Sequence, residues 1–176
     1  MEHWATHPDV LKIYAHHYKT GEVMPDSLIQ KLQNASKFNQ GFNTTELVAA
    51  AILDMGWHLV DTPEFKDVNQ FETDAMNKIG MISEIIPRYR TTYFKHIFDN
   101  DGYSAGYYSY LWAEVLDAGA FEAFEESGNI FNQEIATRYR KYILERGGSD
   151  DPMKLYVKFR GAEPNPDALL KNRGLK

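Results

Sequence analysis

The sequence predicts an all-α fold in which residues 1–176 form a single helical unit. Three observations support this prediction. Over much of the chain, apolar side chains recur at intervals of three and four residues, the spacing that places them on one face of a helix. Residues that start or stop helices, mainly Asn, Asp, Pro and Gly, stand between these segments. No stretch of strand length alternates between apolar and polar residues.

Four helices are predicted in the first half of the chain. The first begins at Pro8 and stops at Gly21, and the second begins at Pro25. The third begins at the cap residues Asn43-Thr44-Thr45. Its apolar face is predicted to contain Leu47, Val48, Ala51, Ile52, Met55 and Leu59. A fourth, weaker pattern covers residues 68–79.

The second half is predicted to contain the longest helix, from about Ala105 to Glu126. Before it, between residues 81 and 93, the helical pattern weakens and Pro87 breaks it. After it, Asn132 caps a helix whose inward residues are Ile135, Tyr139, Tyr142 and Ile143. Two short helices follow Asp151-Pro152 and Asn165-Pro166.

Composition and charge exclude several classes of protein. A net charge of −6 and a pI near 5.5 argue against binding to nucleic acid or to an anionic membrane. No apolar run approaches the ~20 residues of a membrane span, and no export signal is visible. With no cysteine there is no disulfide framework, thiolate zinc site or cysteine nucleophile. We expect a protein of the cytoplasm.

The densest group of chemically useful side chains is the stretch HIFDNDGYSAGYYSYLW, residues 96–112. On a helical wheel that includes Tyr103, this residue and Tyr110 share one edge, within about 40° of each other. The apolar face beside them is predicted to contain Tyr108, Leu111, Trp112 and Val115, with Tyr107 between the two groups. These phenols either pack a helix against its neighbours or donate hydrogen bonds to a bound carbonyl or oxyanion, with His96 as a third donor. The residues alone leave both interpretations open.

A second candidate is the pair His3 and His7, four residues apart in HWATH. This spacing can chelate a metal from one helical face. No glutamate follows His3 to act as a general base, and Pro8 disfavours a continuous helix. The sequence contains no Ser-His-Asp arrangement, phosphate-binding glycine loop or zinc-protease motif. We therefore predict no metal site in this chain.

The stretch RYRTTYFKHIFDNDGYSAGYYSYLWAEVLDA resembles the C-terminal part of the thimet oligopeptidase family of zinc metallopeptidases, and most of all its bacterial peptidyl-dipeptidase branch. The segments EHWATHPDVLKIYAHHYKTGEVMPDSLIQKLQNASKFNQGF and LYVKFRGAEPNPDALLKNRGL resemble the same branch. The likeness covers essentially the whole chain. It implies that the chain is the multi-helix C-terminal part of a larger, two-lobed helical peptidase.

The resemblance also implies roles for residues of the tyrosine stretch. Four side chains are expected to bind substrate, namely His96, Tyr103, Tyr107 and Tyr110. Tyr103 and Tyr110 are expected to be catalytic, one or the other stabilising the tetrahedral oxyanion beside zinc. The acidic run Asp99–Asp101 departs from the short glycine run of relatives, so the loop path is expected to differ there.

The family's zinc ligands are two histidines of a His-Glu-x-x-His helix and a later glutamate, all upstream of the part matched here. By resemblance, the full-length parent uses zinc, whereas this fragment alone is expected to hold none at that site and to be inactive. Its expected partners are short peptides and the N-terminal remainder of the enzyme, with self-association through exposed apolar surface. The implied reaction releases dipeptides from the C-termini of short peptides. The alternatives are internal cleavage by an oligopeptidase and a stand-alone helical interaction module.

Overall fold

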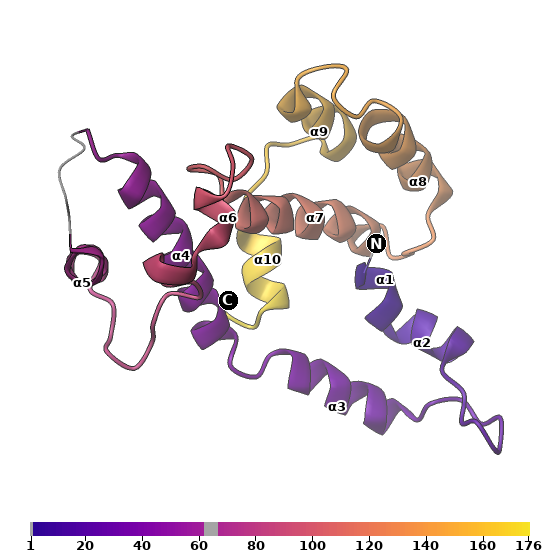
Figure 1. Ribbon diagram of the computed structural model, residues 1–176. Coiled ribbons are helices and arrows are strands. Elements are labelled where there is room, and N and C mark those ends of the chain that lie inside the picture. The colour runs from indigo at the N-terminus through magenta and orange to yellow at the C-terminus, as the bar shows by residue number, and fades with distance from the viewer. Residues whose placement is uncertain (1, 62–66) are drawn as a thin grey trace. The chain divides into compact units, whose positions relative to one another are not determined.

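The computed structural model describes residues 2–61 and 67–176, which form helices joined by turns and loops (Figure 1). Within these residues there is no β-strand, and one isolated bridge pairs His16 with Val23. The all-α prediction is confirmed. In the same ranges, no helix has both the length and the apolar composition needed to cross a bilayer.

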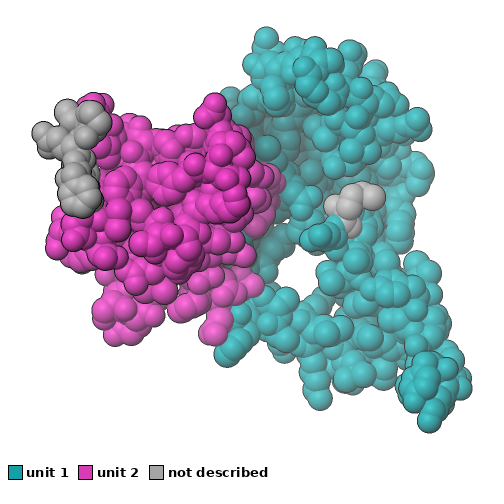
Figure 2. All heavy atoms as spheres, in the orientation of Figure 1, with its two compact units in different colours: residues 1–38, 115–176 teal, residues 39–114 magenta. Residues whose placement is uncertain are grey.

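Contacts divide the chain into two compact units, which Figure 2 distinguishes by colour. Unit 1 contains residues 1–38 and 115–176, and unit 2 contains residues 39–114. The expectation of a single helical unit over residues 1–176 stays a prediction. Each unit is described by itself below.

Unit 2 is organised around α4, Gln40–His58. The other elements are α5 (Val68–Lys78), the 3-10 turn η1 (Thr91–Tyr93), α6 (Lys95–Phe98) and the first part of α7 (Ser109–Glu126). One part of its core joins Leu47 and Ala50 to Phe94, Ile97 and Tyr107. The other part joins Ala49 and Leu53 to Met76. Helix α4 therefore contributes to both halves of the core, which explains its length and its alanine-rich centre.

The predicted apolar face of α4 is displaced from the observed one. The buried positions are Leu47, Ala49, Ala50, Leu53 and Asp54, whereas Met55 and Leu59 are exposed. The predicted residues Val48, Ala51, Ile52 and Met55 instead line an apolar hollow of about 280 Å³ together with Tyr107, Tyr108 and Leu111. Because α4 is apolar on two sides, helical spacing alone did not distinguish the buried side. The helix also begins three residues before the predicted cap Asn43, directly after Asn39 in the left-handed region (φ 57°).

Helix α7 begins at Ser109 and has 18 residues, one fewer than α4. The prediction that it starts near Ala105 and is the longest helix is therefore wrong. Ala105 has φ 54°, in the left-handed region, which interrupts a right-handed helix at that residue. The fourth prediction, for residues 68–79, is confirmed by α5, whose first amides are capped by the Asp67 carboxylate.

Unit 1 contains α1 (Glu2–Thr6), α2 (Pro8–Tyr14), α3 (Asp26–Ser36), the rest of α7, α8 (Gln133–Tyr139), the π-helical turn η2 (Arg140–Leu144), α9 (Pro152–Arg160) and α10 (Asp167–Asn172). The predicted cap Asn132 is confirmed, since its side chain accepts two backbone amides of α8. A helix follows Asp151-Pro152 as predicted, and the Asp151 side chain caps it in the same way. The predicted inward residues of α8 and η2 pack around Ala120, Phe124 and Phe159. The first predicted helix is too long, because α2 ends at Tyr14 and a bridged turn follows.

His3 and His7 do not share a helical face. Helix α1 ends at Thr6, and His7 is the N-cap of α2, where its Nδ1 accepts the Asp9 amide at 3.2 Å. His3 Nε2 lies 2.8 Å from Asp117 Oδ2, and its ring stacks on Phe121. Each histidine thus has a structural partner within unit 1.

Candidate functional site

The structure brings together the four residues that the sequence analysis selected, all within unit 2. The rings of Tyr103 and Tyr110 stack in parallel, with centroids 5.4 Å apart and planes 6° apart. Tyr107 meets Tyr110 edge-on at 5.1 Å. The His96 ring lies 6.1 Å from Tyr103 and 5.8 Å from Tyr107. The result is a compact aromatic cluster that contains three phenols and one imidazole.

A turn, and not a helix, places Tyr103 beside Tyr110. Gly106 donates its amide to the Tyr103 carbonyl at 2.9 Å, which folds the chain back ahead of α7. The predicted neighbourhood of the two phenols is therefore correct, but its helical explanation is wrong. Tyr103 and Tyr110 are 37% and 39% exposed, so both hydroxyl-bearing rings are open to a ligand.

Tyr107 differs from the other two tyrosines because its side chain belongs to the core. It is 3% exposed and packs edge-on against Phe94 at 4.9 Å. Burial raises the pKa of the Tyr107 phenol above its ordinary value. The predicted apolar face is correct for Val115, which is buried, and for Leu111, which packs against the core. It is wrong for Tyr108 and Trp112, whose side chains are 55% and 43% exposed.

The two exposed phenols are electrostatically linked. A side-chain hydrogen bond with Tyr103, reinforced by desolvation, raises the pKa of Tyr110 to about 12. A bond that raises this pKa stabilises the protonated phenol. Near neutral pH Tyr110 is therefore an uncharged phenol that can take part in hydrogen bonds.

His96 has an unusual buried atom. Its Nδ1 is inaccessible to water and has no hydrogen-bond partner among the described residues. The ring is enclosed by Tyr89 at 4.8 Å and by Tyr103 and Tyr107. A buried polar atom without a hydrogen-bond partner is costly. Such an atom therefore needs an explanation, and a functional role is one of them.

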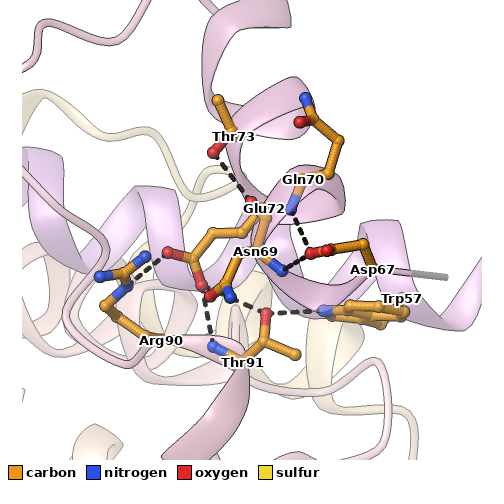
Figure 3. Close-up of polar contacts among 8 residues, drawn as sticks. All are labelled: Trp57, Asp67, Asn69, Gln70, Glu72, Thr73, Arg90 and Thr91. Atoms are coloured by element: carbon orange, nitrogen blue, oxygen red, sulfur yellow. Dashed lines mark hydrogen bonds and ion pairs between the residues drawn. The ribbon is translucent and has the colours of Figure 1, made fainter.

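A buried carboxylate holds the segment that leads to His96 (Figure 3). Glu72 on α5 is 5% exposed, and its Oε1 accepts Arg90 Nε at 2.6 Å. Its Oε2 accepts the Thr91 amide at 3.0 Å and the Thr91 hydroxyl at 3.2 Å. Trp57 Nε1 donates to the same hydroxyl oxygen at 3.0 Å. These contacts fasten η1, and with it the start of α6, to α5.

A second buried carboxylate holds the tyrosine turn. Asp54 on α4 is fully buried, and it accepts the backbone amides of Ala105 at 3.0 Å and Tyr107 at 2.9 Å. Sequence reasoning missed this residue, although a carboxylate inside the apolar run AAAILDMGW is itself an indication of a buried polar role.

In the acidic run Asp99–Asp101 before the turn, two side chains contact residues close to them in the chain. Asp99 pairs with Lys95 one helical turn earlier, and Asn100 Oδ1 accepts the Gly102 amide at 2.8 Å. A Cβ at Gly102 would lie 2.8 Å from that same oxygen, so a larger residue there would displace the Asn100 side chain. Two of the polar residues in this departure from the family pattern thus shape the entry to the cluster.

Zinc is the metal that the family resemblance implies. Within residues 2–61 and 67–176, no three His, Asp or Glu side chains gather closely enough to hold a metal ion. The residues that the structure describes therefore do not fit a zinc site.

Comparison with known proteins decides the family. The family model described as Peptidase family M3 matches residues 1–175. The chain belongs to Peptidase family M3. Dipeptidyl carboxypeptidase from Escherichia coli strain K12 is 47% identical over 176 residues, which is 99% of this chain and 26% of that protein. Its namesake from Salmonella typhimurium strain LT2 is 43% identical over the same shares of both chains.

Oligopeptidase A from Escherichia coli strain K12 is also similar, with 38% identity over 179 residues, covering 100% of this chain and 26% of that protein. The chain thus spans about a quarter of the length of the curated relatives it matches. The resemblance to zinc peptidases is confirmed at the level of the family, which is incompatible with a module of no catalytic ancestry.

Proposed function

We propose that this M3-family chain supplies the substrate-binding and oxyanion-stabilising side of a peptidase that releases dipeptides from the C-termini of short peptides. The observation that carries the proposal is the linked pair of exposed phenols, Tyr103 and Tyr110, beside the unpartnered Nδ1 of His96. Dipeptide release is favoured over internal cleavage because dipeptidyl carboxypeptidases are similar at 47% and 43% identity, against 38% for oligopeptidase A.

The proposed chemistry of these side chains is hydrogen-bond donation. When water attacks a peptide carbonyl, negative charge develops on the carbonyl oxygen, and neutral donors that are already oriented stabilise it. The hydroxyls of Tyr103 and Tyr110 are linked by a side-chain hydrogen bond, so the pair can donate to the developing oxyanion. His96 stays a proposed substrate contact through its ring, because its Nδ1 is inaccessible from outside. Any zinc would be held by ligands other than the residues described here, and no role in metal binding is assigned to the cluster.

The test is Tyr110→Phe in a full-length peptidase that contains this chain. Loss of one oxyanion donor costs about 2.7–4 kcal/mol, so kcat should fall by about a hundredfold to a thousandfold. Zinc content should stay unchanged, as measured by metal analysis of the purified variant. The matched control is Tyr108→Phe, which removes the hydroxyl of an exposed tyrosine outside the cluster and should preserve turnover. Near-normal turnover of Tyr110→Phe would refute the proposed role.

Product analysis distinguishes dipeptide release from internal cleavage. A peptide with a free C-terminus should yield dipeptides in succession, and amidation of that C-terminus should slow the reaction strongly. Cleavage of both peptides at the same internal bond would instead support an oligopeptidase activity.

Tyr107 remains a proposed substrate contact, although its ring is buried in the unit 2 core.

We also propose that the apolar hollow beside α4 is covered by the remainder of the peptidase. Exposed Met55 and Tyr108 line this hollow, and its surface is almost wholly apolar. Without that cover, we expect the chain to self-associate through the same surface. Sedimentation velocity that shows only monomer at high concentration would contradict this expectation.

The absence of cysteine favours a cytoplasmic location, which remains a proposal.

A further inference from the structure

We propose that Asp54 is the positioning residue of the tyrosine turn: its buried carboxylate fixes residues 103–107 so that Tyr103 lies against Tyr110. The expected effect on catalysis rests on the proposed function. The position of the turn can be measured without an activity assay. Asp54 touches no substrate in this scheme and acts only through the backbone that it holds.

The carboxylate contacts both sides of the turn. Oδ1 accepts the amide of Ala105 at 3.0 Å, and Oδ2 accepts the amide of Tyr107 at 2.9 Å. Because Gly106 lies between them, the two bonds force alternate amides of the turn to point to the same side. A carboxylate offers an acceptor to each amide, whereas a carboxamide would present one acceptor and one N–H group. The pairing therefore requires Asp and not Asn.

The backbone conformation of the turn needs such a restraint. Ala105 has φ 54°, a left-handed conformation that is unfavourable for any residue with a Cβ. A residue in such a strained conformation persists only where several contacts with the surrounding structure hold it in place. Here the amide of the strained residue itself is one of the two bound by Asp54.

His58, one helical turn after Asp54, completes the restraint. Its Nδ1 lies 2.8 Å from Asp54 Oδ1 and 2.9 Å from the Asp54 carbonyl oxygen. Both neighbours are acceptors, so Nδ1 carries the proton and donates. The fully buried carboxylate thus has three donors, which fix its rotamer and satisfy its charge.

Ring packing alone does not explain the position of Tyr103. Tyr107 is anchored in the core by its ring, which meets Phe94 and Tyr89. Tyr103, four residues earlier, is 37% exposed, and its contacts are with Tyr110 and His96. The two amide bonds to Asp54 lie between the anchored ring and the exposed one, where they determine the direction of the chain.

The first experiment measures amide hydrogen exchange by NMR in Asp54→Asn. The amides of Ala105 and Tyr107 should exchange about tenfold to a hundredfold faster, because a buried bond to a charged acceptor is lost at each. The nuclear Overhauser contacts between the rings of Tyr103 and Tyr110 should weaken. The matched control is Glu72→Gln, which alters the other buried carboxylate of unit 2 and should leave these two amides protected. Unchanged protection in Asp54→Asn, or equal loss in the control, would overturn the proposal.

A second variant covers the case in which Asp54→Asn folds poorly. Glycine adopts positive φ without strain, so Ala105→Gly added to Asp54→Asn should restore folding and the contact between Tyr103 and Tyr110, at least in part. Failure of this rescue would overturn the link between the carboxylate and the turn.

In the full-length peptidase, Asp54→Asn should lower kcat per folded enzyme about tenfold or more, with KM changed by less than about twofold, and Ala105→Gly should recover part of the loss. A rise in KM with unchanged kcat would contradict a role in positioning oxyanion donors. If the two amides lose protection while Tyr110→Phe retains full turnover, the positioning stands and the proposed function fails. If the amides stay protected, the positioning fails whatever the activity.

Discussion

Replacing Glu72 by Gln should destabilise the protein by about 2 kcal/mol, because this carboxylate is the buried end of a three-bond clamp. Bonds to a charged acceptor contribute roughly 1.5–3 kcal/mol each, but bonds that share one acceptor do not add fully. The Arg90 side chain is 41% exposed, so water compensates much of its lost ion pair. The main cost is therefore at Thr91, whose amide must face either a weaker acceptor or the new N–H group.

The assay is urea unfolding followed by tryptophan fluorescence, since the Trp57 indole donates to the Thr91 hydroxyl oxygen and reports on this region. The control is Asp74→Asn on the same helix, where an exposed carboxylate accepts the Gln70 side-chain amide at 2.9 Å. This change should stay within about 0.5 kcal/mol. If Glu72→Gln costs no more than Asp74→Asn, the clamp does not stabilise unit 2 and the reasoning is refuted.

Four further predictions concern single side chains. Tyr103→Phe should lower the pKa of Tyr110 from about 12 toward its ordinary value of 10.0, because the bond with Tyr103 is the main cause of the shift. NMR of 13C-labelled tyrosine would measure this pKa, and an unchanged titration of Tyr110 would contradict the prediction. Since the folded-state pKa of Tyr110 is raised, its contribution to stability should be complete below pH 10 and lost as the pH rises through about 12, as measured by unfolding at each pH. Tyr107→Ala should cost about 3–5 kcal/mol of unfolding free energy, like other large buried aromatic truncations, and a cost near zero would place the ring outside the core. Asn132→Ala should cost about 1 kcal/mol, because two amides of α8 lose their cap, and Asn132→Asp should not.

The local part of the fold was predictable because its causes lie within a few residues. Asp67, Asn132 and Asp151 cap helices by bonds to amides two and three positions ahead, so the sequence contains both partners of each bond. The inward residues of α8 were identified because that helix has one apolar side. Helix α4 is apolar on two sides, and there the same rule selected the wrong face.

The candidate site was predictable in its membership but not in its geometry. The cluster of tyrosines and His96 was visible in one short stretch, and the family resemblance gave its chemistry. The helical wheel placed Tyr103 beside Tyr110 for the wrong reason, since Ala105 breaks the helix and a turn replaces it. Neither the buried, unpartnered Nδ1 of His96 nor the bond that raises the pKa of Tyr110 follows from spacing.

Short-range bonds and periodic apolar patterns are set by neighbours in the chain, so the sequence was enough to predict the helical class, the Asn132 cap and the residues of the aromatic cluster. Only the tertiary structure revealed that Asp54, 51 positions before Ala105, and Glu72, 19 positions before Thr91, hold the segments that carry the cluster. A buried carboxylate accepts hydrogen bonds from whichever backbone amides the fold places next to it. The separation of such partners along the chain follows no regular spacing, so it cannot be read from the sequence.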